Sequence, residues 1–393
     1  MNNYKYKSKL YLDACATSPI RLSVLNKMNE VHLSILGNPS SIHYEGVLAM
    51  ESLERSRQII MNIMNGLNHE IIFTSGATES INLAIKGSTQ SMNPARIVIS
   101  AVEHPAVIKS ANSLIRQGWA VTYWPVDNYG CIDLSKVEEL LAPPTRFVSL
   151  IWGQSEVGTI QPVIEIAKLC RDRGILFHCD ATQILNHTLI NLSDLPFDMI
   201  SLSGHKIQGP RGIGLLAYNS NTQLSSLILG GEQQNSIRAG TEPIALIAGL
   251  AEAIQSLYRS KVLLNNIETT ETEFVGDLTN YLRNQLSNIN EIEFTGHPIS
   301  RLSNHISFVI KSTNNNVVSG RSIVRKLSDF GVLSSSGSAC SSFSHSDSPV
   351  LTAMNFPENL RSSGVRFSLG PWLTMEALRD IPNYLLESIK LCS

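Results

Sequence analysis

The chain has 393 residues, of which 43% are hydrophobic and 16% charged, which is the composition of a folded protein with a large core. Its net charge of −2 argues against a broad surface for nucleic acid or for anionic membranes. The polar N-terminus (MNNYKYKSKLYLD) and the lack of an apolar run of about 18 residues predict neither a secretory signal nor a membrane span.

The cysteines are scattered along the chain and form no CxxC pair. A large chain gains little from so few disulfides, and this spacing suits no zinc site. We therefore expect no metal and a reduced, cytoplasmic protein in which most thiols are small buried groups. The six cysteines are Cys15, Cys131, Cys170, Cys179, Cys340 and Cys392.

Short apolar runs alternate with amphipathic stretches through the first two thirds of the chain. Strands buried on both faces and separated by helices, such as the one expected at Val163–Arg173, indicate a mostly parallel α/β sheet. We predict a large α/β domain over residues 15–254. Its expected strands are Ile71–Thr74, Arg96–Ser100, Val121–Pro125, Arg146–Trp152, Ile175–Asp180, Met199–Ser203 and Gly214–Tyr218.

The pattern changes after about residue 254. One long helical stretch is expected over Ile244–Ile289, and its first, apolar part predicts a buried helix. Mixed strands and helices follow, which favours a smaller α+β domain made of residues 1–14 and 255–393. The expected strands lie in NEIEFTG, NHISFVIKS and GVRFSLG, and the expected helices at Ser322–Phe330 and Met375–Lys390.

A first candidate binding segment is FTSGATESINLAIKG, residues 73–87. A strand runs through Ser-Gly-Ala-Thr into a helix, so the backbone amides at Ala77 and Thr78 and the Thr78 hydroxyl could bind a phosphate. The alternative is ordinary capping of the helix, with Glu79 favouring its dipole.

A histidine follows the next strand, in AVEHPAV (residues 101–107). The imidazole of His104 could stack on a planar ring or move protons. A loop histidine that only makes structural hydrogen bonds is the alternative.

Two polar residues follow the strand in ILFHCDATQ (residues 175–183). Ligand groups gather at the carboxyl ends of parallel strands, so Asp180 and Gln183 are candidates for a site there. A carboxylate at this place could keep a pyridine nitrogen protonated. Alternatively, Asp180 is the N-cap of the following segment.

A lysine ends the buried strand in FDMISLSGHKIQGPRGIGLLAY (residues 197–218). Desolvation there would lower the pKa of Lys206 and supply the neutral amine that an aldehyde cofactor needs. The alternative is a lysine that extends from the strand end into solvent. Together, a phosphate site, a partner for a ring nitrogen and an amine after strands of one sheet predict pyridoxal phosphate (PLP) as the cofactor.

These motifs resemble the cysteine desulfurase family of fold-type I PLP enzymes, in its NifS/IscS-like group, over nearly the whole chain. The resemblance is to the subgroup with a long SSGSAC-type cysteine loop. The matching motifs, in the family's order, are YLDACATSP, GNPSSIH, FTSGATESINLAIKG, EHPAV, HCDATQ, SGHKIQGPRGIG, IRAGTEP, SSGSACSS and RFSLG.

The resemblance implies roles for individual residues. Lys206 would bind PLP covalently and then transfer protons, Asp180 would pair with the pyridine nitrogen, and His104 would stack on the ring. Asn38 and Arg366 would hold the substrate carboxylate, as suits the planar fork of arginine. Gln183 and Ser155 would contact the ring oxygen. The phosphate would be held by residues of both subunits of a homodimer: Ala77, Thr78, Ser203 and His205, together with Thr241 of the partner subunit.

The implied reaction removes sulfur from L-cysteine. Cys340 would attack the substrate sulfur and keep it as a persulfide, L-alanine would leave, and an acceptor or scaffold protein would take the sulfur for iron–sulfur clusters or thiolation. A thiol is largely protonated at neutral pH, and His104 is the implied acceptor of its proton. The Ser/Gly-rich stretch around Cys340, SSSGSACSSFSHSDSP (residues 334–349), is expected to be mobile.

Some positions differ from the family pattern. Gln154-Ser155-Glu156 stands where Asn-Asn-Glu is usual, and Gly230-Gly231-Glu232 alters a glycine-rich stretch. Two other functions stay open beside a desulfurase. One is a PLP-dependent lyase for cysteine, cystine or selenocysteine, although such an enzyme needs no thiol like Cys340. The other is a non-catalytic partner in a sulfur-transfer complex.

Overall fold

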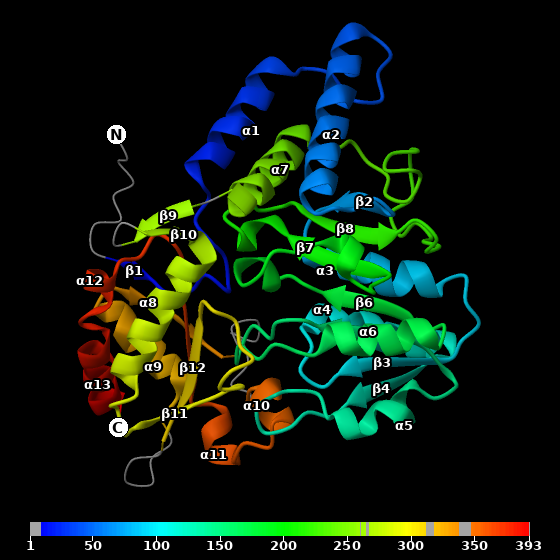
Figure 1. Ribbon diagram of the computed structural model, residues 1–393. Helices are drawn as coiled ribbons and strands as arrows, with labels where there is room; N and C mark the ends of the chain where they lie inside the picture. The colour runs from blue at the N-terminus through cyan, green and yellow to red at the C-terminus, as the bar shows by residue number, and fades with distance from the viewer. Residues whose placement is uncertain (1–8, 260, 265–266, 312–317, 338–346, 393) are drawn as a thin grey trace.

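The structure, a computed structural model, describes residues 9–259, 261–264, 267–311, 318–337 and 347–392, with 261–264 and 267–269 as backbone only. Two sheets lie side by side in it, a large one with its helices and a smaller one formed mainly by the C-terminal third (Figure 1). Residues 10–12 also belong to the smaller part, because β1 (Leu10–Tyr11) pairs in parallel with β13 (Val332–Leu333). The domain boundaries stay a prediction.

The large sheet confirms all seven predicted strands, with ends shifted by two residues at most. Within the described residues its order is β2-β8-β7-β6-β5-β3-β4, and β8 alone runs in the opposite direction to the other six strands. The sheet is therefore mostly parallel, as expected. Its strands are β2 (His69–Thr74), β3 (Arg96–Ser100), β4 (Ala120–Trp124), β5 (Thr145–Ile151), β6 (Leu176–Asp180), β7 (Met199–Ser203) and β8 (Gly214–Asn219).

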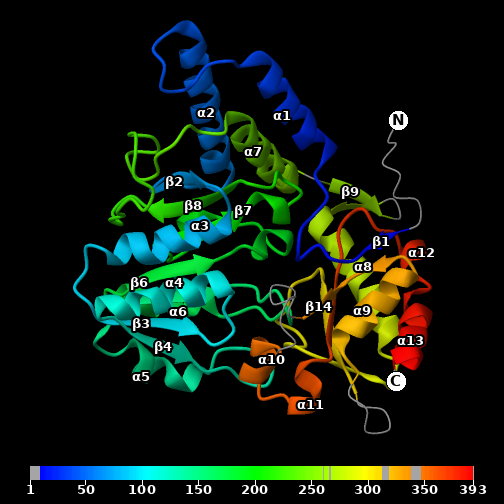
Figure 2. The same ribbon diagram turned by 180° about the vertical axis from the view of Figure 1, so that it is seen from behind.

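Both faces of this sheet are covered, because its strands are apolar at successive positions. Ile97 and Ile99 contact the core under one layer of helices, whereas Val98 between them contacts the core under the other. Figures 1 and 2 show the two layers from opposite sides. One layer has α3 (Ala77–Asn82) and α4 (Pro105–Ser113); the other has α2 (Tyr44–Ile63), α5 (Val137–Leu141), α6 (Val163–Asp172) and the predicted apolar helix α7 (Ile244–Arg259).

The smaller sheet is antiparallel, in the order β11-β12-β15-β14, and confirms the three strands predicted for this part. Phe308 and Phe367 pack on one of its faces under a layer of helices, while Val309 joins the core of the larger part. The strands are β11 (Ile292–Phe294), β12 (His305–Ile310), β14 (Ser335–Ser336) and β15 (Gly364–Ser368), and the helices are α8 (Glu271–Leu286), α9 (Gly320–Asp329), α12 (Met375–Leu378) and α13 (Ile381–Cys392).

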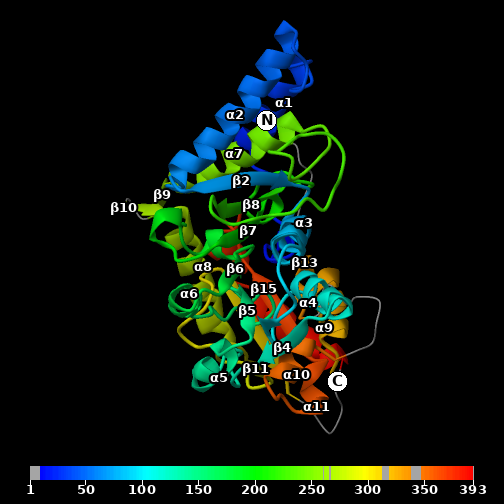
Figure 3. The same cartoon turned by 90° about the vertical axis from the view of Figure 1, so that its right-hand side faces the viewer.

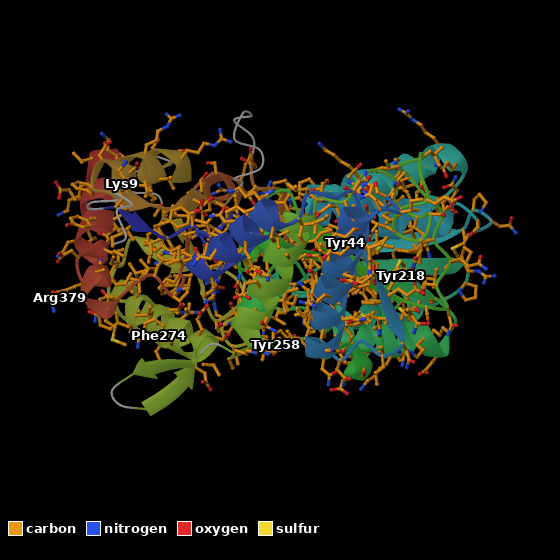
Figure 4. The ribbon with its side chains drawn as sticks, turned by 90° about the horizontal axis from the view of Figure 1, so that it is seen from above. Lys9, Tyr44, Tyr218, Tyr258, Phe274 and Arg379 are labelled. Carbon is orange, nitrogen blue, oxygen red and sulfur yellow. The ribbon has the colours of Figure 1, made fainter. Side chains whose placement is uncertain are left out.

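The prediction of one helix over Ile244–Ile289 is wrong. Between α7 and α8 lies an antiparallel pair, β9 (Lys261–Leu264) and β10 (Ile267–Thr270). Figure 4 shows this pair projecting from the body between Tyr258 on α7 and Phe274 on α8. The second helix has its own start signal, because Thr270 and Glu273 cap each other's backbone amides.

The prediction of one helix over Met375–Lys390 is also wrong, since the chain leaves the helix at residues 379–380. Pro382 has no N–H, so it cannot donate to the carbonyl of Leu378 as an uninterrupted helix requires. A proline is tolerated in the first turn of a helix, which is its place in α13.

The remaining helices project from or bridge the two sheets. α1 (Leu22–Ser34) and α2 extend beyond the large sheet, which Figure 3 shows from the side. α10 (Pro349–Ala353) and α11 (Glu358–Arg361) lie between the lower parts of the two sheets in Figure 1, and Val350 of α10 joins the larger core. Across the described ranges, no helix combines the length and apolarity that crossing a membrane requires.

Candidate active site

A cavity of about 650 Å³ lies where the parallel strands of the large sheet end, against residues 15–17 and β15. Carboxyl ends of parallel strands commonly form ligand sites. Most of the predicted site residues border it, although they come from widely separated segments. They are Ala77, Thr78, His104, Ser155, Asp180, Gln183, Ser203, His205, Lys206 and Arg366.

Three predicted residues are not among those around the cavity. Asn38 lies in the connection between α1 and α2, and Thr241 precedes α7; both are exposed. Cys340 lies outside the described residues, as does most of the stretch that was expected to be mobile.

The predicted phosphate segment joins β2 to α3. Gly76, just before the helix, has a φ of 151°, a conformation that favours glycine over residues with a Cβ. Glu79 accepts a hydrogen bond from the Ser75 N–H at 2.7 Å and pairs with Arg238 at 2.8 Å. Burial would raise the pKa of Glu79, but these hydrogen bonds outweigh it and lower the pKa. Side-chain capping, the alternative for this segment, is absent, because the N-cap of α3 is Gly76. Glu79 does lie in the first turn, where its charge favours the helix dipole, and Thr78 borders the cavity.

Asp180 is the last residue of β6 and is buried, with 3% of its surface exposed. Its Oδ1 accepts hydrogen bonds from the N–H of Thr182 at 3.0 Å and from the Thr182 hydroxyl. The alternative role as a helix N-cap is wrong, because the next helical turn, Ile184–Asn186, has Gln183 as its N-cap. The Asp180 carboxylate instead closes a local turn while it lines the cavity.

Gln183, three residues further on, donates from its amide to the carbonyl of Cys15 at 2.9 Å. Its Oε1 is buried and has no hydrogen-bond partner among the described residues. A buried acceptor without a donor costs free energy, so the site fits a ligand that would donate or bring a hydroxyl to this place.

His104 is the N-cap of α4, and its Nδ1 accepts a hydrogen bond from the Ala106 N–H at 3.1 Å. The structural role foreseen as an alternative is therefore present. Because Nδ1 accepts, the proton of a neutral ring is assigned to Nε2. His104 can then offer an N–H while bordering the cavity.

Lys206 closes a short 3-10 turn (Gly204–Lys206) directly after β7. Its Nζ donates to the carbonyl oxygens of Cys15 and Ala16, the latter at 3.0 Å. The amine therefore lies against the Cys15–Ala16 backbone at the cavity wall, instead of extending into solvent. Burial and the charges of Lys206 and Arg211 lower the pKa of the neighbouring His205 to about 4, which keeps that imidazole neutral.

Arg366, on β15, brings the smaller sheet to the cavity and is 3% exposed. Its Nη2 donates to Asp13 at 2.6 Å and its Nη1 to the carbonyl of Ser155 at 2.9 Å. The buried Nε has no partner among the described residues. The guanidinium is thus fixed in place with hydrogen-bonding capacity left for an anionic ligand.

Sequence reasoning missed two residues at this site. Asp13 pairs with Arg366, and Cys15 borders the cavity while its carbonyl meets both Lys206 and Gln183. Burial raises the pKa of the Cys15 thiol, so it is a neutral group. Both residues stand in YLDACATSP, a motif that was recognised as a whole without a role for its members.

Comparison with known sequences places this site in a family. A sequence model of the aminotransferase class-V family matches residues 10–380. Cysteine desulfurase IscS of Dictyoglomus turgidum is 36% identical, with 98% of this chain and 97% of the relative covered. Cysteine desulfurase IscS of Methanosarcina thermophila is 34% identical, with 97% and 92% covered.

Solved structures agree with the sequence relatives. A NifS-like protein superposes with a TM-score of 0.85 at 27% identity, covering 98% of this chain and 99% of the other. A structure described as SspA in complex with cysteine has a TM-score of 0.77 at 31% identity, covering 93% and 99%. The chain therefore belongs to the aminotransferase class-V family and, within it, to the PLP-dependent cysteine desulfurases of the IscS and NifS-like group.

Proposed function

We propose that this protein takes the sulfur of L-cysteine, releases L-alanine and carries the sulfur as a persulfide on Cys340 to an acceptor protein. The observation that carries the proposal is the gathering of Lys206, Asp180, His104 and Arg366 around one cavity. These residues supply an amine, a buried carboxylate, an imidazole and a carboxylate-binding guanidinium. A relative solved with cysteine supports L-cysteine as the substrate.

The residues present fit PLP. Gln183 Oε1 is a buried acceptor without a described donor, the place of a hydroxyl or N–H on a bound ring. Asp180 would face the ring nitrogen, and Ala77, Thr78, Ser203 and His205 would surround the phosphate. Ser155, whose carbonyl is used by Arg366, could contribute its hydroxyl. Bound PLP supplies an electron-withdrawing ring that stabilises negative charge next to the substrate's amine.

The protein's own groups then bind and move protons. The Arg366 guanidinium would bind the substrate carboxylate through the hydrogen-bonding capacity left at Nε. Lys206 would hold or release a proton at Nζ, where the carbonyls of Cys15 and Ala16 stabilise the ammonium form. These contacts favour Lys206 as the group that moves protons at the substrate.

The N-cap contact of His104 favours a ring that carries its N–H at Nε2, as a hydrogen-bond donor. To accept the Cys340 proton there, the ring would have to carry its own proton on Nδ1 and give up the hydrogen bond from Ala106. We therefore propose that His104 in this N-cap geometry donates a hydrogen bond from Nε2 to the reacting substrate and keeps that proton, and that proton transfer to or from the ring depends on protonating Nδ1 and breaking this N-cap contact.

We further propose a homodimer in a reducing, cytoplasmic setting. Asn38 and Thr241 are exposed and do not border the cavity of their own chain, which suits residues that reach the cavity of a second copy. The connection that carries Asn38 and the adjoining ends of α1 and α2 also expose large apolar side chains, which a second copy would cover. They are Leu33, Leu36, Ile42 and Tyr44, between 73% and 99% exposed.

The test measures both products. Holoenzyme incubated with L-cysteine and a thiol acceptor should form L-alanine and sulfide, and Lys206→Ala should form neither. Cys340→Ala should lose persulfide and alanine together, whereas Cys131→Ala, a half-exposed cysteine away from the cavity, should behave as wild type. Full alanine production by Cys340→Ala would contradict the persulfide route and favour the lyase.

A further inference from the structure

Glu156 is a buried carboxyl group in the connection that follows β5, and no role has been given to it above. It is 8% exposed, and its Oε1 accepts a hydrogen bond from the Ser348 hydroxyl, itself 3% exposed. Burial raises the pKa of Glu156 to about 7, although Ser348 and the charge of Arg366 act in the opposite direction. A buried carboxyl is costly, so its contacts deserve a physical reason.

Those contacts lie at both ends of residues 338–346, the part of the sequence that contains Cys340. Gly337 immediately precedes it, and a Cβ added there would lie 2.5 Å from Glu156 Oε1, so the backbone packs directly on the carboxyl group. Ser348 follows it and is the N-cap of α10, accepting from the Leu351 N–H at 3.0 Å. One carboxyl group therefore joins the chain entering the segment to the chain leaving it.

The same short stretch also orients the substrate side of the site. The carbonyl of Ser155 accepts from Arg366 Nη1 at 2.9 Å and lies 3.1 Å from Nε2 of His305. Gln154 stiffens the stretch, because its side-chain oxygen accepts from the N–H groups of Glu156 and Val157, the latter at 2.9 Å. Consecutive residues thus contact the guanidinium on one side and the two ends of the cysteine segment on the other.

We propose that Glu156 is a positioning residue for sulfur transfer, holding Gly337 and Ser348 so that the Cys340 segment starts and ends at a fixed place relative to Arg366. The inference rests on the proposed function, since it concerns the step in which Cys340 receives sulfur. Correct placement of two reacting groups is worth large rate factors, and small displacements are costly.

Protonation of Glu156 should weaken this contact. The ionised form is the stronger acceptor for the Ser348 hydroxyl and is attracted to Arg366 on β15. Among the described residues, the other charged or titratable groups around Glu156 and Arg366 are Asp13, which pairs with Arg366, Cys15, whose pKa burial raises, and His305 on β12, whose pKa burial lowers. Cys15 and His305 are therefore neutral. The Glu156-dependent part of the rate is therefore expected to rise with pH through about 7.

The experiment separates substrate binding from persulfide formation in the holoenzyme. L-cysteine binding is followed by cofactor absorbance, and the persulfide on Cys340 by rapid quenching, alkylation and mass spectrometry. Glu156→Ala should slow persulfide formation about tenfold while changing the binding constant less than about twofold. Glu156→Gln keeps an acceptor for Ser348, so it should restore most of the rate but remove the rise with pH.

Ser348→Ala provides the second arm and should slow persulfide formation as Glu156→Ala does. The matched control is Thr374→Ala, which removes the N-cap of another short helix, α12, and should leave the rate unchanged. If Glu156→Ala does not fold, the other two variants decide. Wild-type rates and pH profiles in both Glu156→Gln and Ser348→Ala would overturn the positioning role of Glu156 and leave the proposed function standing. A wild-type protein that forms no persulfide would overturn the proposed function, and this inference with it.

Discussion

Arg366 is buried in β15 with its guanidinium held by one carboxylate and one carbonyl oxygen. Its partner Asp13 lies in the N-terminal segment, so two distant parts of the sequence share one ion pair, with side chains 4% and 20% exposed. Ion pairs of this kind contribute little net stability when intact, but loss of one partner leaves a buried charge uncompensated. The main role of Asp13 is therefore to hold the Arg366 guanidinium in place, and its contribution to net stability is secondary.

We predict that Asp13→Asn raises the KM for L-cysteine about tenfold, with a smaller change in kcat, because the guanidinium loses its charged partner and a neutral amide oxygen holds it more weakly. The free energy of unfolding should fall by about 3–5 kcal/mol, the usual cost of removing one partner of a buried pair. Steady-state alanine formation and urea unfolding measure the two effects. The surface pair Lys27–Glu30 gives the control, since Glu30→Gln should change neither; an unchanged KM in Asp13→Asn would contradict the prediction.

At the same scale, the sequence predicted which residues meet but not all of their contacts. His104 and Asp180 were each given a binding role and a structural alternative, and the structure places both at the cavity while each also makes a local hydrogen bond, an N-cap contact for His104 and a turn contact for Asp180. Such dual use cannot be inferred from one sequence, because a capping contact depends on local backbone angles. The contacts of Cys15 depend on a tertiary approach of residues far apart in the chain.

Among the elements, β6 carries a buried histidine in the middle of the large sheet. His178 lies between the Ser149 hydroxyl at 2.8 Å from Nδ1 and the Ser201 hydroxyl at 2.9 Å from Nε2. Burial lowers its pKa from 6.5 to about 4, so the folded protein keeps this ring neutral where the unfolded chain binds a proton.

This difference predicts an acid-dependent loss of stability. The contribution of His178 to the free energy of unfolding is complete above about pH 6.5 and is lost as the pH falls toward 4. The loss amounts to about 2 kcal/mol at pH 5. His178→Gln should remove it, so the stability gap between wild type and variant should narrow by about that amount between pH 7.5 and pH 5 in urea unfolding. Comparing the two proteins cancels the contribution of Glu156, whose raised pKa acts in the opposite direction. A constant gap would contradict the prediction.

The start of α8 decides whether the connection from α7 is helix or hairpin. Thr270 accepts from the Glu273 N–H at 3.2 Å, and Glu273 accepts from the Thr270 N–H at 2.8 Å. Thr270→Ala should therefore lower the free energy of unfolding by about 1 kcal/mol. Glu273→Gln can keep both hydrogen bonds and should cost much less. Equal losses in chemical unfolding would argue against the reciprocal cap.

For the whole molecule, the exposed apolar connection between α1 and α2 predicts the assembly. We expect a dimer of twice the 43.2 kDa chain mass by light scattering. Leu36→Asp combined with Ile42→Asp should shift it toward the monomer, because a charge in a covered apolar surface loses its hydration. Leu67→Asp is the matched control, since Leu67 is 87% exposed outside that connection. A wild-type monomer would contradict the proposal.

The sequence by itself determined the large sheet, the three strands of the smaller sheet and ten of the residues that border the cavity. Strand patterns are local, and parallel strands bring the residues after them to one edge, so Asp180 and Lys206 could be placed together without coordinates. Tertiary structure alone decided the pairing of Asp13 with Arg366 and the contacts of Glu156 with Gly337 and Ser348. These depend on which distant segments pack against each other, and periodicity within a segment carries no information about that.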